Sequence, residues 1–135
     1  MAKMWGGRFK KKIDPDFEAF SASLKTDARL LPYDLVINLA HVKALKKAGI
    51  LTAAESRRLS TAIRVLQASH ERGALKLDES QEDVHSAVHA LLKAKTGDLA
   101  DKLHTGRSRN DLVSQSSRLY CLEHTRRAVE QIADL

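Results

Sequence analysis

Apolar residues recur three and four positions apart in four stretches of the chain, which is the spacing of an amphipathic α-helix. The stretches cover residues 35–48, 53–72, 84–96 and 112–135. The apolar positions are Leu35, Val36, Leu39, Val42 and Leu45; Leu59, Ile63 and Leu66; Val84, Val88, Leu91 and Leu92; and Val113, Leu119, Leu122, Val129 and Ile132. The pattern therefore predicts four helices, each with one apolar face.

Residues that commonly cap helices flank the first two patterns. Asp34 is the candidate N-cap of the first helix, and Gly49 is the expected stop at its C-terminal end. Thr52 and Glu55 have the spacing of a capping box, in which each side chain accepts a hydrogen bond from the other residue's backbone N–H. We therefore expect a helical hairpin with a short connection.

The last two helices also begin at polar residues. The stretch Ser80–Asp83 resembles a capping box, and Asn110 or Asp111 is expected to cap the helix that starts at Leu112. No glycine, proline or change of pattern ends this helix before Leu135, although natural domains normally signal their helix stops. We therefore expect the sequence to break off within a helix.

The composition favours helices packed on helices. Aromatic residues make up only 4% of the 135 residues, so a core must consist mostly of Leu, Ile, Val and Ala. With 43% hydrophobic and 30% charged residues, the chain suits one packed domain. A single cysteine, Cys121, forms no internal disulfide and indicates a reducing compartment. Because it follows a helical pattern, Cys121 is expected to be a small buried side chain.

The net charge of +6 fits an acidic small-molecule ligand at least as well as nucleic acid. No nucleic-acid motif is present and no aromatic residues alternate with the basic ones, so we expect no nucleic-acid partner. Lys10–Lys12 and the three arginines Arg57, Arg58 and Arg64 are interpreted as solvated. No apolar run approaches the ~20 residues of a membrane span, and the basic start lacks the apolar stretch of a secretory signal. We therefore expect a cytoplasmic protein without membrane contact.

The most polar stretch, Lys102–Asp111, lies between the third and fourth helical patterns. It contains two arginines, a histidine, two hydroxyls, an amide and a carboxylate around Gly106. Arginine supplies paired donors for carboxylate or phosphate, and the free N–H groups of a following helix add donors and partial positive charge. We interpret this stretch as the binding site of a small anionic molecule, with a solvated loop as the alternative.

Histidines and one carboxylate on the predicted helices are further candidates. His85 and His89 lie four apart and share a helix face, but no third ligand is evident and Ser86 stands where a zinc protease has glutamate, so we expect no metal site. His41 is expected to be a hydrogen-bonded core group. Asp83 is the stronger candidate, because a carboxylate near arginines stays ionised and accepts a hydrogen bond from a substrate guanidinium or amine.

Residues 104–111, His-Thr-Gly-Arg-Ser-Arg-Asn-Asp, match without a gap the signature of the argininosuccinate lyase family, a branch of the fumarase/aspartase superfamily. Further segments resemble that family in the same order and at similar spacing. They are Met4–Phe9, Ser21–Leu24 with Asp27, Arg29 and Leu30, Ala40 and His41, Gly49 and Ile50, and Glu82–His85. The resemblance covers the whole chain, and co-ordered motifs are more specific than any single one.

The resemblance implies an all-α fold. Residues 21–111 would form the N-terminal helical domain of the fumarase/aspartase-like fold, with the signature loop at 102–111. Residues 1–20 would form an irregular arm, and residues 112–135 the start of a long helix of the central bundle.

The activity that the resemblance implies is β-elimination of argininosuccinate to arginine and fumarate, without a metal or organic cofactor. The residues expected to bind the substrate are Ser23, Asp83, Arg109 and Asn110, followed by Arg107 and Thr105 as weaker candidates. His85 is expected to orient its neighbours.

The catalytic residues are expected to lie outside this segment. In the family the general base and acid belong to a Thr-His motif and to a serine on a mobile Gly-Ser-Ser loop, and this sequence contains neither. The family's sites are also assembled from several subunits of a homotetramer. We therefore expect the isolated chain to lack lyase activity, which a turnover assay checks.

The sequence also departs from the family pattern at several positions. Asn38 replaces the usual Ser, His89 replaces Glu, Ala100 and Asp101 replace a Gly-containing pair, Leu112 replaces Gln, and Ser116 replaces Asp. These departures leave alternatives open: a related lyase of the superfamily, a non-catalytic or degenerate fragment that acts as a helical interaction module, and, last, a nucleic-acid-binding surface with steep salt dependence.

Overall fold

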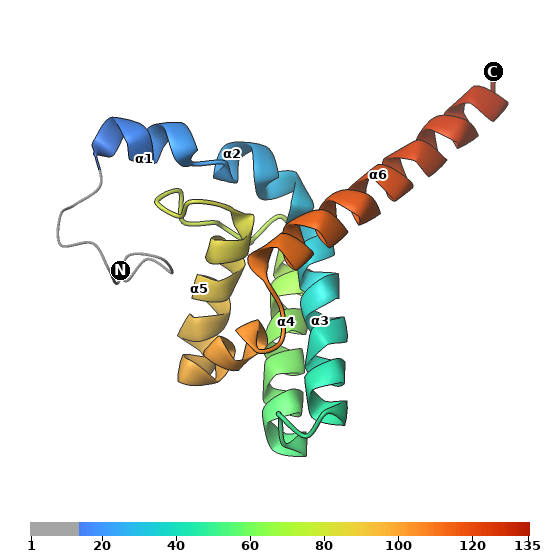
Figure 1. Ribbon diagram of the computed structural model, residues 1–135. Helices are drawn as coiled ribbons and strands as arrows, with labels where there is room; N and C mark the ends of the chain where they lie inside the picture. Colours follow the sequence, from blue (N-terminus) through green and yellow to red (C-terminus); the bar gives the residue numbers. More distant parts are fainter. Residues whose placement is uncertain (1–13) are drawn as a thin grey trace.

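The computed structural model describes residues 14–135, and every regular element within them is a helix. The expectations for Met4–Phe9 and Lys10–Lys12 lie outside the described residues. In chain order the elements are α1 (Pro15–Ser21), α2 (Leu24–Asp27), the 3₁₀ turn η1 (Ala28–Leu30), α3 (Leu31–Lys47), α4 (Ala53–Glu71), α5 (Val84–Thr96), the 3₁₀ segment η2 (Gly97–His104) and α6 (Arg109–Ala133). The predicted all-α fold is confirmed (Figure 1).

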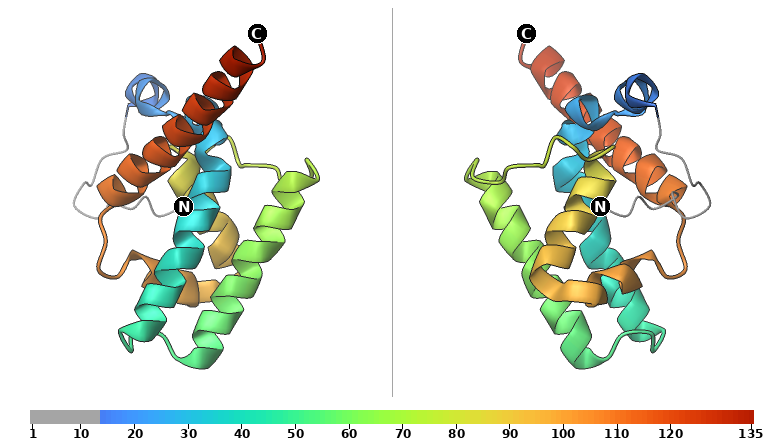
Figure 2. Two further views of the ribbon diagram at one scale, coloured as in Figure 1. Left: turned by 90° about the vertical axis from the view of Figure 1, so that its right-hand side faces the viewer. Right: turned by 90° about the vertical axis from the view of Figure 1, so that its left-hand side faces the viewer.

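Helices α3 and α4 form an antiparallel hairpin, and α5 packs against both (Figures 1 and 2). Gly49 ends the first arm as predicted, with a φ of 74° and its N–H bonded to the carbonyl of Lys46. The predicted capping box then starts α4. The N–H of Thr52 donates to Glu55 at 2.8 Å, and the N–H of Glu55 donates to the Thr52 hydroxyl at 3.2 Å.

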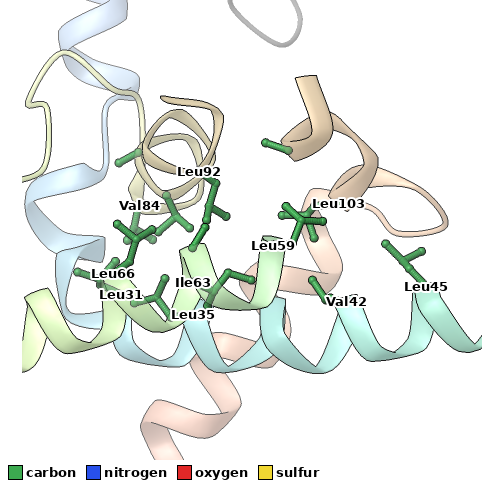
Figure 3. Close-up of a cluster of buried hydrophobic side chains, with 14 of the residues drawn as sticks. Leu31, Leu35, Val42, Leu45, Leu59, Ile63, Leu66, Val84, Leu92 and Leu103 are labelled. Atoms are coloured by element: carbon green, nitrogen blue, oxygen red, sulfur yellow. The ribbon is translucent and has the colours of Figure 1, made fainter. Parts of the chain in front are cut away.

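The core lies between these three helices and η2, and it is aliphatic as the composition predicts (Figure 3). Leu35 from α3, Leu59 and Ile63 from α4 and Leu103 from η2 belong to this one cluster. These side chains are at most 1% exposed, and burial of each contributes about 1.5–3 kcal/mol. Burial of Leu103 therefore fixes the position of the end of η2, where the polar stretch Lys102–Asp111 begins.

Helix α6 packs on α3 and η1 as far as Glu123 and then leaves the body of the molecule (Figures 1 and 2). The last long-range contacts are made by Tyr33, whose hydroxyl donates to Glu123 at 2.8 Å and whose ring meets Tyr120 edge-on. Burial and the Glu123 carboxylate together raise the pKa of Tyr33 to about 12. Leu122, between these two contact residues, and Val129 and Ile132 beyond them are exposed.

Cys121 is exposed, so the prediction of a buried side chain was wrong. Its neighbours Tyr120 and Glu123 contact Tyr33 of α3, while Cys121 itself faces away from that contact. The apolar periodicity of α6 does not reveal which of its positions are covered within residues 14–135.

Asp34 is not the N-cap of α3, which begins at Leu31. The turns α2 and η1 run into α3 without a break, so this helix needs no capping side chain, and Pro32 in its first turn sets the start. Asp34 instead lies within the helix and is fully buried.

Two other helix starts also differ from the predictions. Asp83, not Ser80, caps α5, and its carboxylate accepts a hydrogen bond from the N–H of Ser86 at 2.8 Å. Helix α6 begins at Arg109, and its N-cap is Ser108 rather than Asn110 or Asp111. In each case the N-cap is the polar residue with an extended backbone directly before the first helical residue.

Within residues 1–20, for which no regular element was expected, residues 15–20 belong to helix α1. Asp14 caps this helix through hydrogen bonds from the N–H groups of Asp16 and Phe17, and Pro15 opens it. Phe17 and Phe20 are exposed on it. The prediction of an irregular arm is therefore wrong for this part.

Candidate substrate-binding site

The stretch Lys102–Asp111 folds as the end of η2, a short turn and the first turn of α6. Gly106 turns the backbone with a φ of 72°, where a residue with a Cβ is strained. The Ser108 hydroxyl accepts from the N–H of Asn110 at 3.2 Å, and Asp111 accepts from the N–H of Ser108 at 2.7 Å. This capping box occupies N–H groups that we expected to be free for an anion, so the anion donors here are mainly side chains.

Arg109 lies at the centre of a cluster drawn from three segments. Its Nη2 forms an ion pair with Asp83 and donates to the Ser86 hydroxyl at 3.3 Å, while its Nη1 lies 3.9 Å from Glu82. The N–H of Ser23 donates to the carbonyl of Glu82 at 2.8 Å. The fold thus brings together three predicted site residues, Ser23, Asp83 and Arg109, that are far apart in sequence.

The cluster presents its cation outward and its anion inward. The Arg109 side chain is 25% exposed and that of Asp83 only 9%. Burial by itself raises the pKa of Asp83, but the hydrogen bonds from Arg109 and from the N–H of Ser86 outweigh burial and hold this pKa below its ordinary value. Asp83 is therefore ionised at neutral pH, as predicted, with Arg109 as the partner that faces solvent.

Three other predicted residues, Ser23, Asn110 and Thr105, are polar and at least partly accessible. Ser23 precedes α2 without capping it, and its hydroxyl donates to Asp27. Asn110 is exposed, and its side chain makes no hydrogen bond within residues 14–135. Thr105 is also exposed, and its carbonyl accepts a 3.1 Å hydrogen bond from His41. His41 is half-buried at the edge of α3, so the prediction of a core group was wrong, although the imidazole is hydrogen-bonded.

Arg107 points to the opposite side of the loop, against α3. Its Nη2 donates to Asn38 at 2.6 Å, and its Nε and Nη1 are buried without a hydrogen-bond partner among the described residues. Arg107 also lines a cavity of about 360 Å³ between α3 and α6, together with His41 and Asp111. The two arginines of the signature, two positions apart, therefore face different surroundings.

His85 turns away from the loop and into the protein. Its Nδ1 lies 2.7 Å from the carboxylate of Asp34, and both side chains are almost fully buried. A buried carboxylate needs such a partner, because an unpaired charge in the interior costs several kcal/mol. His85 thus orients Asp34 rather than the exposed cluster at Arg109.

His89 and His104 form a second polar group beside the loop. Their ring centroids lie 4.8 Å apart, and the Nε2 of His89 is 3.1 Å from Asp101 without hydrogen-bond geometry. Burial lowers the pKa of both histidines, and for His104 the neighbouring His89 and Arg107 lower it further. The loop is therefore bordered by imidazoles that favour the neutral form.

Within residues 14–135 no group of three or more His, Cys, Asp or Glu side chains is arranged to hold a metal ion. In the same residues, no helix has the length and apolar character that crossing a membrane requires.

The departures from the family pattern fall on both buried and exposed positions. Asn38 binds Arg107, and His89 lies against Asp101, so two departing residues are in contact with one another. Leu112 and Ser116 are buried on the face of α6 that packs inward, where Ser116 donates to the carbonyl of Leu112 at 2.7 Å. Within the described residues none of these side chains forms a hydrogen bond or ion pair with Arg109 or Asp83.

Sequence reasoning missed three contributors to this region. Glu82 and Ser86 flank Asp83 and contact Arg109. Their polar side chains next to Asp83 at the start of α5 are the signal by which the sequence could have identified them. Asp34 had no local signal, because its partner His85 is 51 positions away.

Comparison with known proteins gives one family and many relatives. The family described as lyase matches residues 7–135. The chain is 44% identical over 133 residues to a protein of Caldanaerobacter subterraneus subsp. tengcongensis named argininosuccinate lyase. Proteins of the same name from Desulfatibacillum aliphaticivorans and Streptococcus agalactiae are 38% and 36% identical over 133 residues.

Each of these alignments covers 98% of the chain but only 29–30% of the relative. The chain therefore spans less than a third of the length of the curated relatives it matches.

Proposed function

Because the chain belongs to the lyase family, we propose that it forms the N-terminal part of an argininosuccinate lyase. The observation that carries this proposal is the meeting of Ser23, Asp83 and Arg109 beside the signature loop. The reaction is β-elimination: a base removes a proton beside a carboxylate, the C–N bond breaks, and the guanidinium nitrogen leaves with the electron pair and is protonated, giving arginine and fumarate.

In this proposal the chain binds and orients substrate, and the proton-transferring groups lie elsewhere in the protein. The Arg109 guanidinium, which also pairs with Asp83, donates to a substrate carboxylate, and the Asn110 side chain donates to the same carboxylate. Asp83 and Ser23 bind the guanidinium end or hold Arg109 in place. This arrangement favours the transition state, since negative charge collects on the bound carboxylate as the proton leaves.

The proposed enzyme acts in the cytoplasm as a homotetramer, without metal or organic cofactor. The exposed apolar side chains along α6 support assembly, because they need a partner surface. In the division we propose, residues 21–111 form the N-terminal domain and residues 112–135 enter the central bundle. The same apolar face favours a second candidate for the isolated chain, a helical module that binds other subunits without catalysis.

The test is release of fumarate from argininosuccinate, followed by its ultraviolet absorbance, with the intact protein that carries this sequence. Arg109→Lys keeps the charge but loses the paired donors, and we expect kcat/KM to fall by about a hundredfold, which corresponds to ~2.7 kcal/mol. Arg58→Lys on the exposed face of α4 is the matched control and should change kcat/KM less than twofold.

Absence of fumarate release by the intact protein would overturn the proposal, as would equal effects of the two substitutions. The 135-residue chain alone should show no turnover above background, whereas turnover by that chain would place the acid and base within it.

A further inference from the structure

Asn38 connects the signature loop to the interior of the protein. This α3 residue is 3% exposed, and its Oδ1 accepts a hydrogen bond from Nη2 of Arg107 at 2.6 Å. Its Nδ2 donates to the carbonyl of Asp34 at 3.0 Å and to the Asp34 carboxylate. The orientation of the amide follows, because the flipped amide would place NH₂ against the guanidinium and oxygen against the carboxylate.

The connection continues from α3 to α5. The second carboxylate oxygen of Asp34 lies 2.7 Å from Nδ1 of His85, and Asp34 is 0% exposed. Arg107, Asn38, Asp34 and His85 therefore form a continuous chain of contacts from the signature loop, through α3, to the first turn of α5. Asp83, the N-cap of the same helix, pairs with Arg109. These contacts therefore link the surroundings of Arg107 to those of Arg109.

No other hydrogen bond holds the Arg107 side chain within the described residues. Its Nε and Nη1 are buried without a partner, so Asn38 is the group that fixes the direction of the guanidinium. Burial lowers the pKa of Arg107, while the negative charges of Asp34 and Asp111 oppose that effect. The two carboxylates offset burial only in part, and a single amide holds the guanidinium in place.

An amide suits this position better than the other side chains of similar size. Aspartate would accept from Arg107 but repel Asp34, and leucine would leave a buried donor and a buried acceptor without partners at about 1–3 kcal/mol each. Serine both accepts and donates, but its hydroxyl reaches less far. By the resemblance Ser is usual at this position, so Asn38→Ser tests what the longer reach of the amide contributes.

We propose that Asn38 is a positioning residue for substrate binding, which sets the place of Arg109 and Asn110 by anchoring Arg107 two and three residues before them. The proposal rests on the proposed function. The anchor acts through the loop and touches no substrate, so its loss weakens substrate binding more than it slows the chemical step.

The experiment uses the intact protein with Asn38→Leu, Asn38→Ser and the control Thr96→Val. Thr96 is also 3% exposed, and its hydroxyl donates to the carbonyl of Leu92 at the other end of α5. Thr96→Val therefore removes an equally buried hydrogen bond outside the signature loop. We expect Asn38→Leu to raise KM for argininosuccinate by about ten- to a hundredfold with kcat changed less than threefold. Asn38→Ser should give a smaller rise, and Thr96→Val a change below twofold.

Hydrogen exchange measured by mass spectrometry gives a readout that does not depend on activity. Peptides covering residues 103–112 should exchange faster in Asn38→Leu and, to a lesser degree, in Asn38→Ser, but not in Thr96→Val. If Asn38→Leu fails to fold, Asn38→Ser decides by the same two measurements.

The outcomes separate the two proposals. Unchanged KM and loop exchange in the Asn38 variants, or equal changes in Thr96→Val, would overturn the role of Asn38. If the wild-type protein releases no fumarate while loop exchange still depends on Asn38, the anchoring of the loop stands and the proposed function fails.

Discussion

Single residues of the signature loop have different roles although they are chemically alike. Arg107 and Arg109 are separated by one serine, yet the first is held against α3 by Asn38 and the second pairs with Asp83 at the surface. The difference arises because Arg107 lies in the turn before the N-cap Ser108, whereas Arg109 is the first residue of α6. Arginine content alone therefore does not identify which guanidinium is available to a substrate.

Gly106 allows a prediction with an internal control. Gly106 and Gly73 have φ values of 72° and 66°, and an added Cβ would meet nothing within 4 Å at either position. Alanine at each should therefore destabilise the protein by the same amount, about 1–2 kcal/mol, through backbone strain alone. Only Gly106→Ala should also raise KM for the substrate, because only Gly106 shapes the signature loop.

Chemical denaturation and steady-state kinetics of the two variants check this prediction. An equal rise of KM in Gly73→Ala, which lies after α4 and away from the loop, would show that the effect comes from general instability.

At the scale of elements, ion pairs and one buried leucine hold the segment between α5 and α6. Lys93 of α5 donates to Asp101 of η2 at 2.8 Å, and Lys102 pairs with Glu55 of α4 at 2.6 Å. Exposed ion pairs of this kind contribute little each, so Leu103 in the core remains the main anchor of η2. The histidine pair beside the loop makes this region sensitive to acid.

We predict that stability falls as the pH drops below the ordinary histidine value of about 6.5. The pKa values of His89 and His104 are lowered in the folded state, so the unfolded chain binds more protons as the pH falls, and protonation favours unfolding. The stabilising contribution is present above pH ~6.5 and is lost as the pH falls toward the folded pKa values.

His104→Gln should reduce this loss, so its melting temperature should decline by a few degrees less than that of the wild type between pH 7 and pH 5. Thermal melts at several pH values measure the difference. His70→Gln, near the end of α4, is the control. A pH dependence of His104→Gln identical to the wild type would count against the histidine pair as the cause.

At the scale of the molecule, α6 presents an apolar surface that is not covered within residues 14–135. Its first turns belong to the site, while Leu122, Val129 and Ile132 are 60–70% exposed on its outer part. An apolar row of this kind on a single helix is stable in water only when another surface covers it.

We predict that Val129→Asp weakens assembly of the intact protein by about a hundredfold, because a charge buried at an apolar contact costs ~3 kcal/mol. Gln131→Asp introduces the same charge on the other side of the helix and should leave the assembly intact. Light scattering across a concentration series gives the mass of each variant. Unchanged assembly of Val129→Asp would show that this part of α6 is not a subunit contact.

The sequence by itself determined the features that depend on neighbours in the chain. Helical periodicity, the capping box of Thr52 and Glu55 and the stop at Gly49 are local, because each involves residues at most a few positions apart. The signature loop was also visible as a polar stretch before a helix. These signals were sufficient for the all-α fold and for the place of the loop.

The tertiary structure alone decided which groups meet. Asp34 and His85, and Asn38 and Arg107, are 51 and 69 positions apart, and no local pattern links them. It also decided that Ser108 is the N-cap of α6, that Cys121 is exposed, and that Asp34 is a buried partner rather than an N-cap. The physical reason is that burial and pairing of polar groups depend on how helices pack, whereas sequence patterns report only the helix to which each residue belongs.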